Sequence, residues 1–256
     1  MKSILRYILL VFTSLLFSFS YSQEFNKTDS QGRKHGKWYK TYEGTKKIRY
    51  SGTFKNGVPT GLFLFYYENG KIKAKNNYFN KGKDSYASTY HKNGKLMSMG
   101  KYVDQKKDSV WVFLDQWGNY ISRDTYKKGK KHGKCVLFYA YNPKIDEGQP
   151  NLLEVTFYNH GEKDGEYTKY YKNGKKMIHG NYVLNEKEGK FTTYYSTGKK
   201  KTEIHYKHGI KNGYTLNYDG NEEVTSKQFY KNGYLLEGKI LKDYLERKRN
   251  KAKKKN

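Results

Sequence analysis

The chain repeats a short pattern about every 24 residues, and this period constrains the fold more than any other feature. Each unit has a small residue, an aromatic residue two places later, an aromatic pair, a turn and then a tyrosine. The small residues that mark the units are Gly36, Gly61, Ser85, Ser109, Gly133, Gly165, Gly189, Gly213 and Gly238. One interval is longer because it holds an insertion around Asn142–Leu153. A fixed short period predicts supersecondary units that stack on their neighbours.

One unit predicts two strands and two turns. Leu62–Tyr67 is rich in strand formers, and Asn69-Gly70 is a hairpin signal in which both residues would take a positive φ. In the strand that follows, lysines alternate with apolar and small residues. Period-2 alternation predicts one buried face and an opposite cationic, solvated face.

A second turn closes the unit and has glycine in most copies, as in Asn56-Gly57. Glycine there predicts a left-handed backbone, which Asn185 and Gln105 would have to adopt in two other units. Tyr102, Tyr182 and Tyr206 recur on the alternating face, so we expect buried rings there, and we place Lys187 in a turn. The first-strand aromatics break strict alternation, which leaves either a bulge or rings on both faces.

Together these signals predict an all-β fold, an elongated antiparallel β-hairpin ladder with a short C-terminal helix. We expect the repeat domain to span residues 23–238, with about eight units. Helical spacing of apolar residues predicts a helix from about Lys239 to Asn250 that caps the open edge of the last unit. Residues 239–256 would then form the capping helix and a basic tail.

Residues 1–22 have the pattern of a signal peptide. Lys2 and Arg6 precede an apolar run from Tyr7 to Phe19, and small residues before Gln23 predict cleavage there. The alternative is an uncleaved N-terminal anchor, although the run is short for a membrane span of about 20 residues. We therefore expect an exported protein of the periplasm, cell envelope or extracellular space.

The formal net charge of +27 has two interpretations. Lysines can simply keep an exposed sheet soluble and monomeric. They can also form a surface that binds an anionic partner, and export favours a protein partner, lipid head groups or envelope glycans over nucleic acid. The candidate partner-binding residues are those of the basic tail, Arg247, Lys248, Arg249, Lys251, Lys253, Lys254 and Lys255.

No pattern of catalytic residues accompanies the repeats. The sequence lacks nucleophile-elbow, phosphate-loop and dinucleotide fingerprints, and His205-x-x-His208 has no supporting cysteine or carboxylate cluster. The single cysteine, Cys135, occupies the aromatic position of its unit, which favours a small buried hydrophobe over a reactive thiol. We expect no enzyme activity and no catalytic, cofactor or metal site.

The repeat resembles the MORN repeat, and is most similar to the bacterial variant found in proteins labelled YwqK-type antitoxins. The resemblance lies in Gly36–Tyr39, Gly165–Lys175 and Gly189–Tyr195. It implies a β-hairpin ladder that scaffolds, binds proteins or associates with lipid. Some units depart from the pattern: Ser85 and Ser109 replace the marker glycine, and Ala87, Cys135 and Thr215 replace the aromatic residue.

These observations predict an exported, non-enzymatic binding or scaffold protein of the cell envelope. The resemblance leaves a second possibility open, an antitoxin or immunity-type protein that neutralises a toxin partner. In both cases Gly36, Gly61, Gly133, Gly165, Gly189 and Gly213 are expected to be structural anchors of the repeats.

Overall fold

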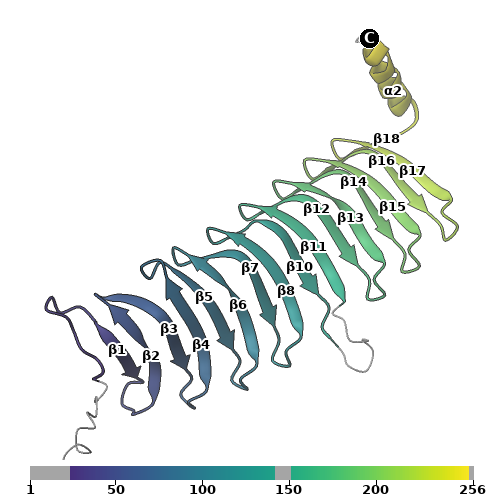
Figure 1. Cartoon of the computed structure of the whole chain (residues 1–256). Coiled ribbons are helices and arrows are strands. Elements are labelled where there is room, and N and C mark those ends of the chain that lie inside the picture. Colours follow the sequence, from purple (N-terminus) through teal and green to yellow (C-terminus); the bar gives the residue numbers. More distant parts are fainter. Residues whose placement is uncertain (1–23, 142–150, 254–256) are drawn as a thin grey trace, which may run out of the picture.

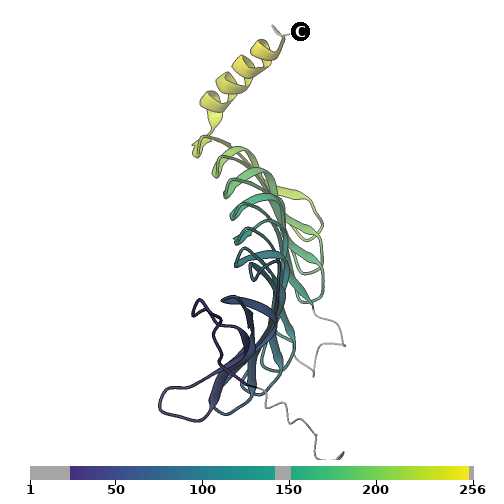
Figure 2. The same ribbon diagram turned by 60° about the vertical axis from the view of Figure 1, so that its left-hand side comes forward.

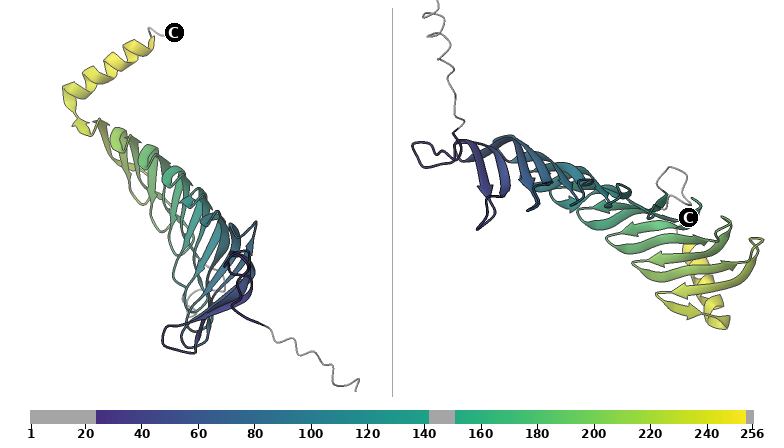
Figure 3. Two further views of the ribbon diagram at one scale, coloured as in Figure 1. Left: turned by 90° about the vertical axis from the view of Figure 1, so that its left-hand side faces the viewer. Right: turned by 90° about the horizontal axis from the view of Figure 1, so that it is seen from below.

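The protein is a long, single-layered β-sheet with one helix at its C-terminal end (Figure 1). This computed structural model describes residues 24–141 and 151–253. The predicted signal peptide at 1–22, part of the predicted insertion, and Lys254 and Lys255 lie outside the described residues. Turned views show the strands stacked in a twisted ladder, from which the helix projects (Figure 2 and Figure 3).

The first half of the ladder contains β1 (Gly36–Thr41), β2 (Ile48–Lys55), β3 (Val58–Tyr66), β4 (Ile72–Phe79), β5 (Asp84–Tyr90), β6 (Leu96–Val103), β7 (Lys106–Leu114), β8 (Tyr120–Lys127) and β9 (Lys130–Lys131). The second half contains β10 (Gly133–Phe138), β11 (Leu152–Asn159), β12 (Glu162–Tyr170), β13 (Lys176–Val183), β14 (Glu186–Tyr194), β15 (Lys200–Lys207), β16 (Ile210–Tyr218), β17 (Val224–Lys231) and β18 (Tyr234–Leu236), followed by α2 (Gly238–Lys253).

Nearly every strand pairs with the next strand of the chain, always antiparallel. The two-residue β9 pairs with β8, and β10 also pairs with β8, which carries the sheet into its second half. The same antiparallel pairing then continues from β10 to β18. The predicted all-β hairpin ladder with a short C-terminal helix is therefore confirmed.

The expected geometry of the Asn69-Gly70 turn is wrong, because only Gly70 has a positive φ, of 80°. The Gly70 amide donates to the Tyr67 carbonyl, and the Tyr67 amide donates to the Lys71 carbonyl. The loop thus has three residues, and its left-handed glycine follows an ordinary turn. The Asn69 side-chain oxygen stabilises the loop by accepting a hydrogen bond from the Lys71 amide at 3.1 Å.

The second turn of the unit has two consecutive residues with positive φ, the geometry that we predicted for the first turn. Lys55 pairs with Val58, and the two residues between them, Asn56 and Gly57, have φ values of 53° and 81°. Two left-handed residues define the turn that matches the twist of a tight hairpin. The expected left-handed backbone at Asn185 and Gln105 is also found, with φ values of 69° and 60°.

Most marker residues create a bulge in the first strand of their unit, whereas β5, with Ser85 as marker, pairs with β4 in unbroken register. Ser51 pairs with Leu64 and Thr53 with Thr60, so Gly52 alone faces Gly61–Phe63. Gly61 has a φ of 64°, which a residue with a Cβ adopts at a cost. The bulge explains why the aromatic residues of this strand break strict alternation, because it turns the ring of Phe63 into the core. Positive φ values also occur at Gly36, Gly133, Gly165, Gly189 and Gly213, as expected of structural anchors.

The main core is a row of side chains along one face, in which neighbouring members are matched in size, and Thr168, Thr192 and Phe229 are buried on the opposite face. Large buried rings sit over glycines of the preceding strand: Phe63 over Gly52, Trp111 over Gly100 and Phe191 over Gly180. Where the ring is missing, a larger side chain replaces the glycine. Ala87 pairs with Asn76 in this way, which keeps the row filled.

Tyr102, Tyr182 and Tyr206 are half-buried, so the expectation of fully buried rings is wrong in degree. They stand edge-on beside the buried rings, as Tyr182 does at 5.4 Å from both Tyr167 and Phe191. A single sheet layer covers only one side of its own ring row, which leaves the outer rim of each tyrosine in solvent. Cys135 is buried and unpaired, as expected of a small hydrophobe.

Tyrosines also bind each unit to the next through the backbone. The hydroxyl of Tyr67 donates to the Tyr90 carbonyl at 2.7 Å, and that of Tyr171 donates to the Tyr194 carbonyl at 2.8 Å. His91 occupies the same repeat position and contacts the Leu114 carbonyl at 3.0 Å. The second residue of the aromatic pair therefore links its unit to the next unit by a side-chain hydrogen bond.

The C-terminal helix begins and ends close to the predicted positions but does not cap the sheet edge as expected. None of its residues is buried, and Tyr234 of the last strand is 76% exposed. The helix contacts the ladder through Tyr244, whose ring centroid lies 5.5 Å from that of Phe229. Because β18 has only three residues, the helix leaves the sheet before it can lie along the edge.

Candidate functional site

A row of lysines lies on the same face as the buried rings, two residues before the marker position of most units. We name it the lysine–tyrosine row, and from β7 to β16 each ammonium lies over the ring of a half-buried tyrosine. Its lysines are Lys107, Lys131, Lys163, Lys187 and Lys211, and its tyrosines are Tyr126, Tyr158, Tyr182, Tyr206 and Tyr230. The distances from ammonium nitrogen to ring centroid run from 4.7 Å at Lys211 to 5.3 Å at Lys131.

The repeat sets the spacing of this row. One unit contributes two strands, and strands lie about 4.8 Å apart, so successive ammonium groups are about 10 Å apart along the ladder. Many of these lysines contact a second ring, as Lys187 contacts Phe191 at 5.2 Å and Lys163 contacts Tyr167 at 5.4 Å. The rings hold the lysine stems in place through cation–π contacts and apolar packing.

The row presents both cations and hydrogen-bond donors. Burial raises the pKa of Tyr126, Tyr158, Tyr182 and Tyr206 above the ordinary tyrosine value, so these phenols keep their protons. An anion on this face would therefore meet ammonium groups and neutral O–H donors side by side.

Carboxylates approach the row at two places, beside Lys131 and beside Tyr167, whose hydroxyl donates to Glu154 at 3.3 Å. Asp124 is buried and lies 3.2 Å from the Lys131 ammonium. Burial lowers the pKa of Lys131, but the attraction of Asp124 outweighs it and leaves that pKa above its ordinary value. Burial lowers the pKa of Lys107, and there the nearby Asp124 only partly compensates. In the described parts of the chain, Lys163, Lys187 and Lys211 form no ion pair with a carboxylate.

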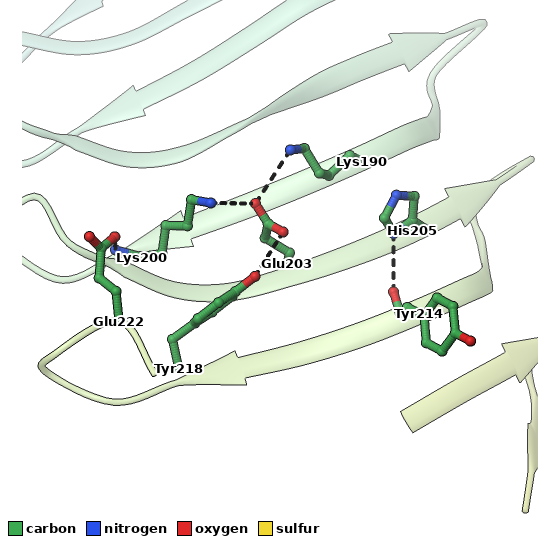
Figure 4. A network of polar contacts seen from close by, with 7 residues as sticks. All are labelled: Lys190, Lys200, Glu203, His205, Tyr214, Tyr218 and Glu222. Carbon is green, nitrogen blue, oxygen red and sulfur yellow. Dashed lines mark hydrogen bonds and ion pairs between the residues drawn. The ribbon is translucent and has the colours of Figure 1, made fainter. Parts of the chain in front are cut away.

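A polar network occupies the opposite face near the C-terminal end (Figure 4). The buried Glu203 carboxylate accepts from Lys190 at 3.3 Å, from Lys200 at 3.2 Å and from the Tyr218 hydroxyl at 2.9 Å. Burial alone would raise the pKa of Glu203. The three hydrogen-bond partners lower that pKa by more, so it lies below its ordinary value. A carboxylate with both oxygens paired is a structural group rather than a free acid or base.

Histidines and carboxylates are otherwise dispersed. His205 contacts the Tyr214 carbonyl at 3.1 Å, whereas His208 lies 3.7 Å from Glu186. Within residues 24–141 and 151–253 no group of three side chains is arranged to hold a metal ion. No helix in this part of the chain is long and apolar enough to cross a membrane.

The predicted basic tail is placed apart from the lysine–tyrosine row. Arg247, Lys248, Arg249, Lys251 and Lys253 are exposed on α2, which projects beyond the last strands (Figure 1). Arg247 donates to the Asp243 carbonyl at 3.2 Å within the helix. The structure therefore has two separate cationic elements.

Sequence reasoning missed the row itself. It placed the lysines on the face opposite the rings, where Lys73 and Lys75 are indeed exposed. It also placed Lys187 in a turn, but Lys187 lies in β14 over two rings. The sequence does contain a signal for the row, because lysine recurs two residues before the marker position. A period-2 pattern does not show the bulge that turns this position toward the rings.

Comparison with known proteins identifies the repeated unit. The family model described as a MORN repeat variant matches residues 59–80, 83–104, 163–183 and 187–208. These four segments are similar to MORN repeats. They coincide with the strand pairs β3–β4, β5–β6, β12–β13 and β14–β15, so each matched unit is one hairpin of the ladder. The units marked by Ser109 and Gly213 lie outside the matched segments but keep the same pairing.

Whole-chain comparisons add little to the MORN assignment. No curated protein matches the chain. A solved porin-like protein from Bacteroides uniformis is 13% identical, and the alignment covers 77% of this chain and 91% of that chain with a TM-score of 0.13. At that TM-score the likeness supports no conclusion about this protein.

Proposed function

We propose that this protein is an exported, non-enzymatic scaffold of the cell envelope that binds an anionic partner surface through its lysine–tyrosine row. The MORN units supply a long, repetitive platform. The observation that carries the proposal is the regular placement of Lys163, Lys187 and Lys211 over tyrosine rings on one face.

Two features of the row favour binding over simple solubility. A lysine that only keeps a sheet soluble needs no fixed position, whereas these lysines are half-buried and held by rings. Each also lies over a tyrosine ring, and a phenol O–H can donate to phosphate or carboxylate oxygens. Of these three phenols, that of Tyr230 beside Lys211 already donates to Gln228 at 3.2 Å. Anionic lipid head groups and acidic envelope glycans both present such oxygens.

The exposed cations of α2 would add a second contact to the same partner. A helix with Arg247, Lys248 and Arg249 on its surface gains about 1 kcal/mol per cation near an anionic membrane. Because this helix is separated from the row, the two elements can be tested independently.

The experiment is co-sedimentation of residues 23–256 with anionic vesicles, and in a second arm with an acidic polysaccharide. The variant Lys163→Gln/Lys187→Gln/Lys211→Gln removes three charges from the row. At about 1 kcal/mol for each lysine, binding should weaken by roughly 100-fold. The matched control Lys73→Gln/Lys75→Gln/Lys201→Gln removes three ring-contacting lysines from elsewhere in the ladder and should bind almost normally.

The outcomes discriminate between binding elements. Equal loss in both triple variants would mean that only net charge matters, which would overturn the role of the row. Loss confined to a protein truncated to residues 23–246 would move the site to the C-terminal helix. Salt should weaken binding steeply, because exposed charges are screened within about 8 Å at physiological ionic strength.

Export is tested separately by cell fractionation and N-terminal sequencing. Cleavage before Gln23 would support the signal peptide, and an intact N-terminus in a membrane fraction would support the anchor alternative. A pull-down of residues 23–256 from envelope extract addresses the antitoxin alternative. Recovery of one stoichiometric toxin-like protein would favour that alternative over a scaffold.

A further inference from the structure

The face opposite the buried rings contains an apolar hollow over β5–β8 and β10, with a volume of about 840 Å³. Tyr86, Met99, Val110 and Val112 contribute its apolar lining. Tyr86 is 59% exposed, Met99 46% and Val110 39%. Contiguous exposed apolar side chains of this kind mark interaction surfaces.

The repeat itself shows that folding does not require these apolar residues. In the two units marked by Gly165 and Gly189 the same repeat positions hold polar or charged residues, whereas the unit marked by Gly213 has Tyr214 and Leu216 there. The counterparts are Glu166 and Lys190 for Tyr86 and Val110, His179 and Glu203 for Met99, and Thr168 and Thr192 for Val112. Met99 pairs with Val112 across β6 and β7 just as His179 pairs with Thr192 across β13 and β14. The apolar set is therefore an addition to the fold.

The geometry limits what can occupy the hollow. β5 to β8 are interior strands whose backbone groups pair with neighbours on both sides, so a partner cannot add a strand there. A helix satisfies its own backbone hydrogen bonds and docks through side chains alone. The chain contains an example, because Tyr244 of α2 packs on Phe229, which pairs with Tyr214 at the repeat position of Tyr86.

The charge of the hollow selects the partner. Lys101 and Arg123 contribute to its lining, and none of the described carboxylates does. A segment with acidic residues beside its apolar face would complement these cations. The basic α2 of a second copy would be repelled, and a flat bilayer surface does not fill a hollow.

We propose that this hollow is the docking site for an acidic amphipathic helix of a partner protein. The site lies on the face away from the lysine–tyrosine row, so it does not depend on the proposed function. A scaffold with these two faces would hold an anionic surface on one side and a protein segment on the other.

The test uses two phage-displayed peptide libraries with the same apolar residues at helical spacing. The remaining positions are drawn from Asp, Glu, Ser and Gln in one library and from Lys, Arg, Ser and Gln in the other. We expect residues 23–256 to enrich acidic peptides only. Enriched peptides are then synthesised, and their dissociation constants are measured by fluorescence anisotropy.

The main variant, Met99→His/Val112→Thr, introduces residue types that the chain already has at the corresponding positions, so it should fold. It should bind the enriched peptides at least 10-fold more weakly. The control His179→Met/Thr192→Val makes the reverse exchange in the second half and should leave the affinity unchanged. Melting temperatures close to that of the original protein exclude unfolding as the cause.

Several results would overturn the proposal. Enrichment of basic peptides, or no enrichment from the acidic library, would reject the acidic helix. Equal affinities for the original protein and Met99→His/Val112→Thr would place the peptides elsewhere. Loss of vesicle binding in that variant, with no peptide binding, would assign the hollow to a lipid surface instead.

Discussion

Substitution of Gly100 by alanine tests the size matching of the core most directly. A Cβ atom added at Gly100 would lie 2.3 Å from the nearest ring atom of Trp111. Ordinary contacts to such atoms begin at 3.4 Å, so about 1.1 Å of displacement is needed (3.4 − 2.3). Gly100 does not have a positive φ, and the clash is therefore the main effect.

The ring cannot move aside without further losses. Trp111 is 2% exposed, its indole Nε1 donates to the Lys101 carbonyl at 3.0 Å, and the ring of Tyr102 stands 4.8 Å away. Overpacking of a tight core costs about 1–3 kcal/mol, and this overlap places Gly100→Ala at the upper end. Alanine recovers about 0.4–1 kcal/mol by restricting the unfolded chain. The net expectation is destabilisation by about 2 kcal/mol.

Urea and thermal denaturation followed by circular dichroism measure the effect. A loss of 2 kcal/mol should lower the melting temperature by about 4–8 °C for a chain of this size. Gly220→Ala is the matched control, because Gly220 also lacks a positive φ and an added Cβ there meets no atom within 4 Å. The control should change stability by less than about 0.5 kcal/mol.

A second variant tests compensation. Gly100→Asn/Trp111→Ala recreates the natural pair of Asn76 with Ala87 from the preceding unit. Its destabilisation should be smaller than the sum of the two single changes by about 1 kcal/mol or more. If Gly100→Ala were as stable as Gly220→Ala, or if the two changes were simply additive, the packing of this ring against this glycine would be refuted.

Three further predictions concern contacts that recur along the ladder. Tyr171→Phe removes the hydrogen bond to the Tyr194 carbonyl and should cost about 0.5–1.5 kcal/mol in urea denaturation, whereas a change near zero would mean that this hydrogen bond does not hold the units together. Lys187→Ala should cost about 0.5–1 kcal/mol because the ammonium over Phe191 and Tyr206 is lost, and the control Lys207→Ala, at an exposed lysine, should change stability by less than about 0.5 kcal/mol. Glu203 has a folded-state pKa below its ordinary value of 4.5, so its contribution is present above pH 4.5 and lost as the pH falls through the folded pKa. The stability difference between the original protein and Glu203→Gln should therefore shrink below pH 4.5, and a difference that stays constant with pH would contradict the network in Figure 4.

The helix at the C-terminus shows what a local pattern can and cannot specify. Apolar spacing from Ile240 to Leu245 was sufficient to predict the helix, because the 3.6-residue period is local. Its expected position on the sheet edge was wrong, because that position depends on where β18 ends and on the contact between Tyr244 and Phe229. Two residues fifteen positions apart in sequence meet only after both elements have formed.

The sequence alone determined the ladder, because a 24-residue period with turn residues at fixed offsets permits few folds other than stacked hairpins. It also determined which positions are left-handed in the second turn, since glycine and asparagine adopt that backbone at low cost. The tertiary structure decided which rings are buried, because the bulge at Gly61 and its counterparts shifts the side-chain alternation within each strand. For the same reason only the structure brings Lys187 over Phe191 and Tyr206, and only pairing across strands gathers Tyr86, Met99 and Val112 into one hollow.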